Sequence, residues 1–228
     1  SATYTPSPDF FGSDSFTFSV TDGTWISEIA TVNIEIVGLN DEPVANDFNL
    51  AVNGSVNVNF NEYVYDEDGD PLNIVSLSYS ETDALKTIFG GTLTLEDNLE
   101  FNYTPPEDVT GISEDFLLYK ASDGISESNI VLGTFDLGGE RGSRANPPEA
   151  FDDNINMMED QEKEITLVGF DPFTNFSGEE TVIITQEPSN GDLGEIIPEI
   201  STSLVLAKWL VTFTPDTNYF GLDSIKYK

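Results

Sequence analysis

Hydrophobic and polar residues alternate with a period of two in several stretches of the chain. The apolar positions of four such stretches are Phe16, Phe18 and Val20; Val32, Ile34 and Ile36; Val56, Val58 and Phe60; and Trp209, Val211 and Phe213. A period of two with one apolar face is typical of a half-buried antiparallel strand. The pattern therefore predicts a chain built from many short strands.

Turn residues separate these stretches at regular intervals. The clearest turn pairs are Asp22-Gly23, Asn53-Gly54, Gly90-Gly91, Asp123-Gly124 and Asn190-Gly191. Such pairs favour tight turns, because Gly, Asn and Asp tolerate the backbone angles that turns require. No convincing amphipathic helix is predicted, and only residues 80–86 fit a short helical turn. Many short strands with frequent turns predict an all-β chain of tandem antiparallel Greek-key β-sandwiches.

One motif occurs three times along the chain. Each copy begins with an aromatic residue followed by Thr-Pro, continues through a Gly to an acidic residue, and then enters an apolar strand. Tyr103 follows Tyr4 by 99 positions, and Phe213 follows Tyr103 by 110 positions. A second marker, Pro-x-Ala, recurs after 105 positions at Pro43 and Pro148. The period is therefore about one immunoglobulin-sized domain.

This period divides the chain into three repeats. Residues 1–40 are expected to be the C-terminal part of one β-sandwich repeat, 41–143 a complete repeat, and 144–228 a third repeat truncated at its C-terminus. The stretch 138–148 is Gly-rich and then Pro-rich, which indicates a flexible loop leading into a stiff extended segment. The chain starts within a strand-like pattern, so the lack of a signal peptide says nothing about secretion.

The charge of the chain is strongly unbalanced. Lys and Arg total 8 against 42 Asp and Glu, for a formal net charge of −34. This argues against nucleic acid and against anionic lipid as partners, because both bind basic surfaces. Like charge also destabilises a compact state by self-repulsion. Bound Ca²⁺, which prefers oxygen ligands, or a saline habitat would relieve that repulsion.

The chain lacks both cysteine and histidine. Disulfides and thiolate chemistry are therefore excluded, and the commonest general base and zinc ligand are missing. An enzyme is not expected. A glycosidase that uses two carboxylates remains conceivable, but nothing in the sequence selects a pair among so many acidic residues.

The strongest chemical signal is the run Asp66-Glu67-Asp68-Gly69-Asp70. Acidic residues at alternate positions around a Gly can converge on one cation, as at the start of an EF-hand loop. The Gly falls one residue before the third acidic position, however, and the later bidentate Glu is missing. The apolar flanks place the run in a loop between strands. Two interpretations stay open here, a Ca²⁺ site and a solvated acidic turn.

These residues carry a family resemblance that covers nearly the whole chain. Asn40-Asp41-Glu42-Pro43 resembles the Asn-Asp-x-Pro linker of bacterial cadherin-like and Ig-like tandem repeats, and 66–70 resembles their Asp-x-Asp-Gly-Asp loop. Residues 4–23 are similar to the closing signature of those repeats. The resemblance implies a non-catalytic structural or adhesive stalk of a secreted bacterial surface protein. Its expected partners are neighbouring repeats, cell-surface glycans or other copies of itself.

The resemblance also implies where Ca²⁺ would bind. Cadherins hold Ca²⁺ between successive domains, which would bring Asn40 and Asp41 together with Asp66 and Asp68 around shared ions. Asp70 would be a further ligand or would support the others. The third repeat keeps only Asp171 of the acidic loop, and its linker has Asn146 followed by Pro147. Weak or no Ca²⁺ binding is therefore expected near residue 145.

Two other features offer alternatives to a plain stalk. Trp25 follows the Asp22-Gly23 turn and is the better candidate for a carbohydrate-binding surface, whereas Trp209 alternates with apolar residues and is expected in the core. Lys120 and Lys228 align where the first repeat has Ser19. A surface lysine is the simpler interpretation of both, and a covalent cross-link to Asn or Asp is the alternative.

Overall fold

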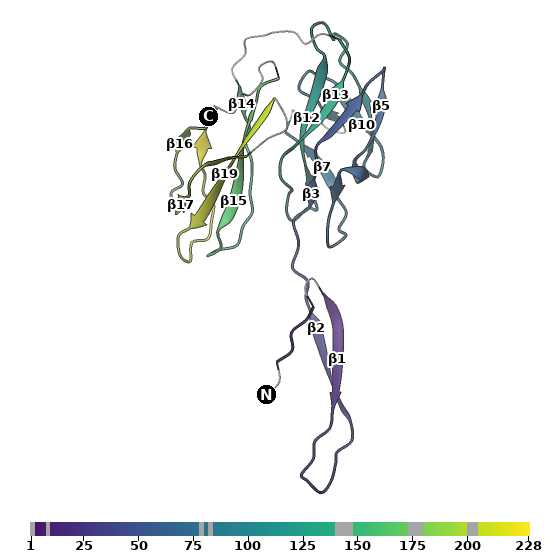
Figure 1. Ribbon diagram of the computed structural model, residues 1–228, viewed down its shortest axis with the longest axis vertical. Helices are drawn as coiled ribbons and strands as arrows, with labels where there is room; N and C mark the ends of the chain where they lie inside the picture. The colour runs from purple at the N-terminus through teal and green to yellow at the C-terminus, as the bar shows by residue number, and fades with distance from the viewer. Residues whose placement is uncertain are drawn as a thin grey trace. The chain divides into compact units, whose positions relative to one another are not determined.

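The computed structural model describes residues 3–7, 10–77, 80–81, 84–139, 148–172, 180–199 and 205–228 (Figure 1). The chain forms two compact units, Ser1–Asp41 and Glu42–Lys228. Within the described ranges, the only helix is the 3₁₀ turn Phe60–Glu62, and no helix is long and apolar enough to cross a membrane. The predicted all-β, Ig-like sandwich class is confirmed.

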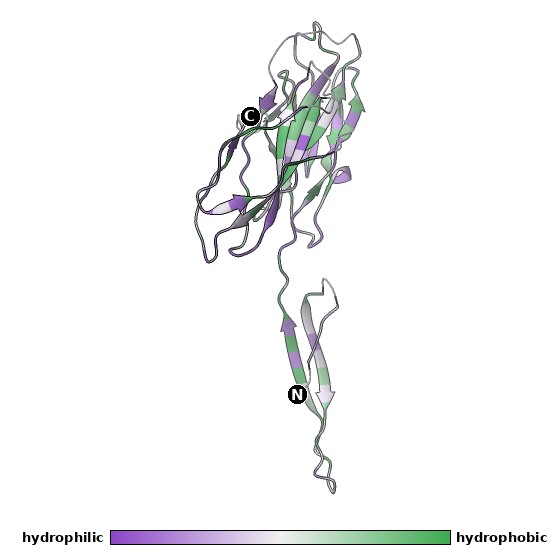
Figure 2. Cartoon of the chain, turned by 60° about the vertical axis from the view of Figure 1, so that its left-hand side comes forward, coloured by the Kyte–Doolittle hydropathy of each residue, from purple (hydrophilic) through white to green (hydrophobic). Residues whose placement is uncertain are grey.

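The N-terminal unit contains an antiparallel hairpin of β1 (Gly12–Phe18) and β2 (Ala30–Ile36). Hydrophobic and hydrophilic residues alternate along it, as the sequence predicts (Figure 2). At its tip, Asp22 accepts hydrogen bonds from the backbone N–H groups of Trp25 and Thr24, both at 2.8 Å. These bonds, that of Trp25 first, hold the pKa of Asp22 below its usual range.

The second unit begins with a sandwich, here called the second domain, in which two sheets face each other. One sheet has the order β5 (Val56–Asn59), β11 (Glu100–Thr104), β10 (Thr92–Asp97), β9 (Ala84–Lys86) and β8 (Ser80–Glu81). The other has the order β4 (Phe48–Ala51), β13 (Val131–Asp136), β12 (Glu114–Ser122) and β7 (Asn73–Ser76). A small ladder joins β3 (Val44–Ala45) to β6 (Val64–Tyr65). The pair β4–β13 is parallel, and the other pairs are antiparallel.

The described residues 80–81 and 84–86 form strands instead of the helical turn that their sequence allows. Their described backbone pairs as β8 and β9, with Ser80 opposite Leu85, and Leu85 lies opposite Leu93 of β10. Because Leu85 packs against the sandwich core, tertiary pairing overrides a weak local preference.

Aromatic side chains fill the core of the second domain. Phe48 packs edge-on against Phe60 with ring centroids 5.7 Å apart, and Tyr103 stacks on Phe135 at 3.7 Å. The predicted core residues Val58 and Phe60 are fully buried. Figure 2 shows that the strands of this domain are rich in hydrophobic residues.

The remainder of the second unit, here called the third domain, is built on one sheet and a separate hairpin. The sheet contains β14 (Glu149–Ala150), β15 (Lys163–Phe170), β19 (Leu206–Pro215) and β17 (Gly191–Leu193), with β18 (Ile197–Glu199) also paired to β19. β16 (Ile184–Gln186) pairs with β20 (Lys226–Tyr227). Trp209 is 8% exposed and packs with Leu167 and Val211, so the prediction that Trp209 belongs to the core is confirmed.

The repeated closing motif has a physical role that recurs. The Tyr4 hydroxyl donates to Asp14 at 2.6 Å in the first repeat, and the Tyr103 hydroxyl donates to Asp115 at 2.9 Å in the second. In the third repeat Phe213 takes the place of the tyrosine. Asp223 accepts there from the backbone N–H of Asn190 at 2.7 Å instead. The acidic residue thus ties its strand to a neighbouring segment in all three repeats.

Candidate metal centre

The acidic run lies in the loop between β6 and β7, as its flanks predict. Gly69 has a φ of +78°, a backbone conformation that favours glycine, and its N–H donates to the Asp66 carbonyl at 3.3 Å. The N–H of Asp70 donates to Asp66 Oδ1 at 3.3 Å. The glycine therefore lets the loop fold back over Asp66.

This turn brings three carboxylates together. One oxygen from each of Asp66, Asp68 and Asp70 lies within 4.8 Å of the other two. Asp66 and Asp68 are half-buried and Asp70 is exposed, whereas Glu67 is exposed and outside the group. The three predicted ligands of the loop are thus adjacent, and the alternate spacing explains why Glu67 is not among them.

One carboxylate oxygen in this group is poorly satisfied by the protein. Asp66 Oδ2 is buried and has no hydrogen-bond donor. A buried oxygen anion without a partner is costly, and such groups usually have a function or a bound ion. The observation distinguishes this cluster from an ordinary solvated turn.

The electrostatics of the cluster favour a cation. Two unit charges about 4 Å apart repel by about 1 kcal/mol in water and by about 4 kcal/mol at an effective dielectric constant of about 20. A divalent ion would turn this repulsion into attraction, and carboxylate oxygens are the ligands that Ca²⁺ prefers. The residues present therefore fit Ca²⁺ chemically.

Asn40 and Asp41 belong to the N-terminal unit, whereas the acidic loop belongs to the second unit. The Asn40 side chain donates to the Asp41 carbonyl at 2.9 Å, which shapes the end of the linker. Their share in a common ion site stays a prediction.

The corresponding position of the third repeat differs. Asp171 is 5% exposed, and its backbone N–H donates to the Val205 carbonyl at 2.9 Å. Asn146 and Pro147 lie outside the described residues. The expectation of weak or no Ca²⁺ binding near residue 145 stays a prediction.

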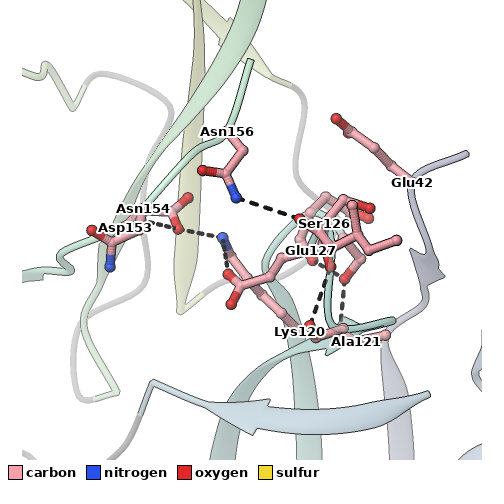
Figure 3. A network of polar contacts seen from close by, with 12 residues as sticks. Glu42, Lys120, Ala121, Ser126, Glu127, Asp153, Asn154 and Asn156 are labelled. Atoms are coloured by element: carbon pink, nitrogen blue, oxygen red, sulfur yellow. Dashed lines mark hydrogen bonds and ion pairs between the residues drawn. The ribbon is translucent and has the colours of Figure 1, made fainter. Parts of the chain in front are cut away.

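Lys120 does not lie on the surface, which corrects the simpler interpretation of its sequence. It is 4% exposed, and its ammonium group pairs with Asp153 and, at 3.4 Å, with Glu127 (Figure 3). Lys228 is exposed, as expected. The sequence does not predict the partners of Lys120, although Phe116 and Leu118 on alternate positions before it indicate a second apolar face on this strand.

Comparison with curated proteins gives no match. Among solved structures, the chain is similar to the endo-fucoidan hydrolase MfFcnA4 from glycoside hydrolase family 107, with 15% identity and a TM-score of 0.33 over 98% of this chain and 32% of that one. It is also similar to the endo-fucoidan hydrolase MfFcnA9 of the same family, with 16% identity and a TM-score of 0.32 over 58% of this chain and 23% of that one. The matches span about a third or less of those enzymes, and at these TM-scores they carry no argument about function.

A family profile gives the clearer result. The profile described as Bacterial Ig domain matches residues 1–35 and 40–135, which together are more than half of the chain. These ranges include nearly all of the β1–β2 hairpin and of the second domain. The chain therefore belongs to the bacterial Ig domain family.

Proposed function

We propose that this chain is a non-catalytic structural segment of a surface protein, and that Ca²⁺ bound by residues 66–70 stiffens the junction before the second domain. Bacterial Ig domains are typically non-catalytic and are common in surface and extracellular proteins. The net charge of −34 implies strong electrostatic self-repulsion, which a bound divalent cation would reduce.

One observation carries the calcium proposal. The oxygens of Asp66, Asp68 and Asp70 lie within 4.8 Å of one another, and Asp66 Oδ2 is buried without a donor. Asn40 and Asp41 would complete the coordination from the preceding linker. An ion held by both sides would cancel local repulsion and restrict hinge motion between the two units.

Calcium should stabilise the full chain, and the acidic loop should be responsible. A ligand that binds only the folded form adds about 2.7 kcal/mol at 100 times its dissociation constant. We expect thermal unfolding to shift upward in Ca²⁺ relative to chelator for the natural sequence and not for Asp66→Asn/Asp68→Asn. Asp97→Asn, at an exposed position of β10, is the matched control and should keep the shift. Superimposable transitions with and without Ca²⁺ would remove calcium from the proposal.

The linker is tested separately by Asp41→Asn. If Asp41 shares the ion, its substitution lowers the Ca²⁺ affinity measured by calorimetry while the loop remains intact. An unchanged affinity would confine the site to the loop and would contradict a role in stiffening the junction.

The place of Trp25 beside a turn favours a second candidate function, glycan binding. Trp25 lies at the tip of the β1–β2 hairpin, where its backbone N–H and that of Thr24 donate to Asp22. An exposed aromatic ring next to a rigid turn offers a stacking surface for a sugar.

Glycan binding would depend on the indole ring. If the candidate is right, binding on a glycan array is lost in Trp25→Ala and kept in Ile26→Ala, since both substitutions remove exposed apolar area at the same turn. Absence of binding by the natural sequence, or equal loss in both variants, would rule out a specific role for the ring.

A further inference from the structure

The second and third domains meet over a second hydrophobic cluster, here called the seam. Its buried members are Phe116, Leu118, Ile130 and Leu132 of the second domain and Val168, Phe170, Val205 and Leu206 of the third domain. We infer that the outer face of β12 and β13 is a docking surface for the following domain and that Lys120 fixes the docked arrangement. This inference goes beyond the calcium proposal and is independent of it.

The packing at the seam is as close as in a domain core. Leu118 and Val168 are both fully buried, and the rings of Phe116 and Phe170 meet edge to face with centroids 5.5 Å apart. β12 is therefore buried on both faces, because its alternate residues Leu117 and Tyr119 fill the core of the second domain. Burial of such side chains favours the docked arrangement through the hydrophobic effect.

The sandwich itself does not need an apolar outer face. The outer positions are the first, third and fifth residues after the acidic residue of the closing motif, which is Asp14, Asp115 or Asp223. They are Ser15, Thr17 and Ser19 in the first repeat, Phe116, Leu118 and Lys120 in the second, and Ser224, Lys226 and Lys228 in the third. On the neighbouring strand, Thr31 of β2 lies opposite Thr17, whereas Leu132 of β13 lies opposite Leu118. Apolar outer residues thus occur in the second repeat, whose outer face is covered by the third domain.

Lys120 lies on the same face, two positions after Leu118. Its ammonium group pairs with Asp153 of the third domain and with Glu127 of its own domain, and its side chain is 5% exposed (Figure 3). Lys163 of the third domain pairs in turn with Glu42 at the start of the second domain. Two of the chain's 8 basic residues therefore join these two acidic domains.

The burial of Lys120 makes the docking specific. A buried ammonium group is tolerated only with a partner in place, and removing one partner of a buried pair is strongly destabilising. Asp153 reaches Lys120 only in the docked arrangement, so a shifted arrangement would leave the ammonium group with Glu127 as the one remaining acidic partner of these two. Ion pairs of this kind are best known for fixing register rather than for adding net stability.

No metal is needed for these contacts. The joint between the second and third domains should therefore hold in chelator, whereas the proposed joint at residues 40–70 should not. The chain would combine a calcium-dependent joint with a calcium-independent one.

The test measures a distance between the two domains in the full chain. The chain has no cysteine, so Asn57→Cys in β5 and Asp192→Cys in β17 give two unique spin-label sites, both exposed. We expect one narrow distance distribution, the same in Ca²⁺ and in chelator. A broad distribution for the natural sequence in chelator would overturn the inference.

Substitutions at the seam should release the third domain. Phe116→Ser/Leu118→Thr/Lys120→Ser gives the second domain the outer face of the first repeat, and we expect the narrow distribution to be lost. Leu95→Thr/Val109→Ser, which changes exposed apolar residues of the same domain, should leave it unchanged. Hydrogen exchange in β11 checks that the second domain remains folded, and an unchanged distribution in the folded seam variant would overturn the inference.

A single substitution isolates the lysine. Lys120→Met keeps the apolar stem and removes the charge, so the seam stays covered while Asp153 loses its partner. We expect a broader distribution than in Lys226→Met, an exposed control. An intact mass equal to that of the sequence is expected, and a deficit of one water located in a peptide that joins Lys120 to Asp153 would show an amide there and overturn the ion-pair account.

Discussion

Replacing Asp115 by Ala is expected to destabilise the second domain by about 3–5 kcal/mol, because it leaves several buried hydrogen-bond donors without their acceptor. This is a large share of the stability of an ordinary domain, about 5–15 kcal/mol. Asp115 is fully buried at the start of β12, where the repeat's closing strand begins.

The expectation follows from the four donors that Asp115 satisfies. Its carboxylate accepts from the hydroxyls of Thr87 and Tyr103 and from the backbone N–H groups of Phe89 and Phe116, at 2.5, 2.9, 3.0 and 2.8 Å. Each buried donor left without an acceptor costs about 1–3 kcal/mol. Burial, followed by the charge of Asp115, raises the pKa of Tyr103 far above its usual range, so the tyrosine remains a donor.

Peptide-resolved hydrogen exchange is the appropriate measurement. Both tryptophans lie outside the second domain, so their fluorescence does not report on it. Protection in β11 and β12 should fall in Asp115→Ala, fall less in Asp115→Asn, and stay within about 0.5 kcal/mol of the natural value in Asp97→Asn. Equal protection in Asp115→Ala and the natural chain would contradict a structural role for the network.

The elements of the fold could be predicted because their pattern is local. Alternation around Phe16, Val58 and Val211 identified strands, and the Asp-Gly pairs identified turns. The acidic loop was also local, since alternate spacing around Gly69 places Asp66, Asp68 and Asp70 on one side. Local patterns of this kind need no knowledge of which strands pair.

The seam could not be predicted in the same way, because it depends on contacts between distant segments. Lys120 finds Asp153 only after both domains fold, and a lone lysine in a strand is usually exposed with its stem on apolar surface. The unbroken apolar run of residues 116–119 did carry a signal, since a strand buried on both faces loses its alternation. That run does not show which domain covers the second face of the strand.

Gly133 is another position whose importance only the fold shows. It lies in the middle of β13, opposite Phe48 of the parallel neighbour β4 and opposite Leu117 of β12. From sequence alone, replacing a glycine inside a strand by alanine is expected to stabilise the domain by about 0.5–1 kcal/mol. A Cβ at Gly133, however, would overlap the Phe48 ring and lie 2.5 Å from its Cε1 atom. Gly133→Ala is therefore expected to destabilise the domain instead of stabilising it.

Gly133→Ala should destabilise the second domain by about 1–3 kcal/mol or more, the usual cost of overpacking a core. The Phe48 ring cannot move aside easily, because it packs against Phe60 at 5.7 Å and Phe135 at 5.5 Å between centroids. Gly194→Ala is the matched control, since a Cβ there meets Thr212 at an ordinary 3.5 Å.

Hydrogen exchange in β13 measures the loss, and a compensating substitution tests its cause. Phe48→Leu removes the ring edge that the new methyl group would meet. The double variant Gly133→Ala/Phe48→Leu should therefore be less destabilised than the sum of its two single changes, because the residues share one space. Strict additivity, or a Gly133→Ala chain as stable as the Gly194→Ala chain, would show that the Phe48 ring of β4 does not pack against the backbone of β13 at Gly133.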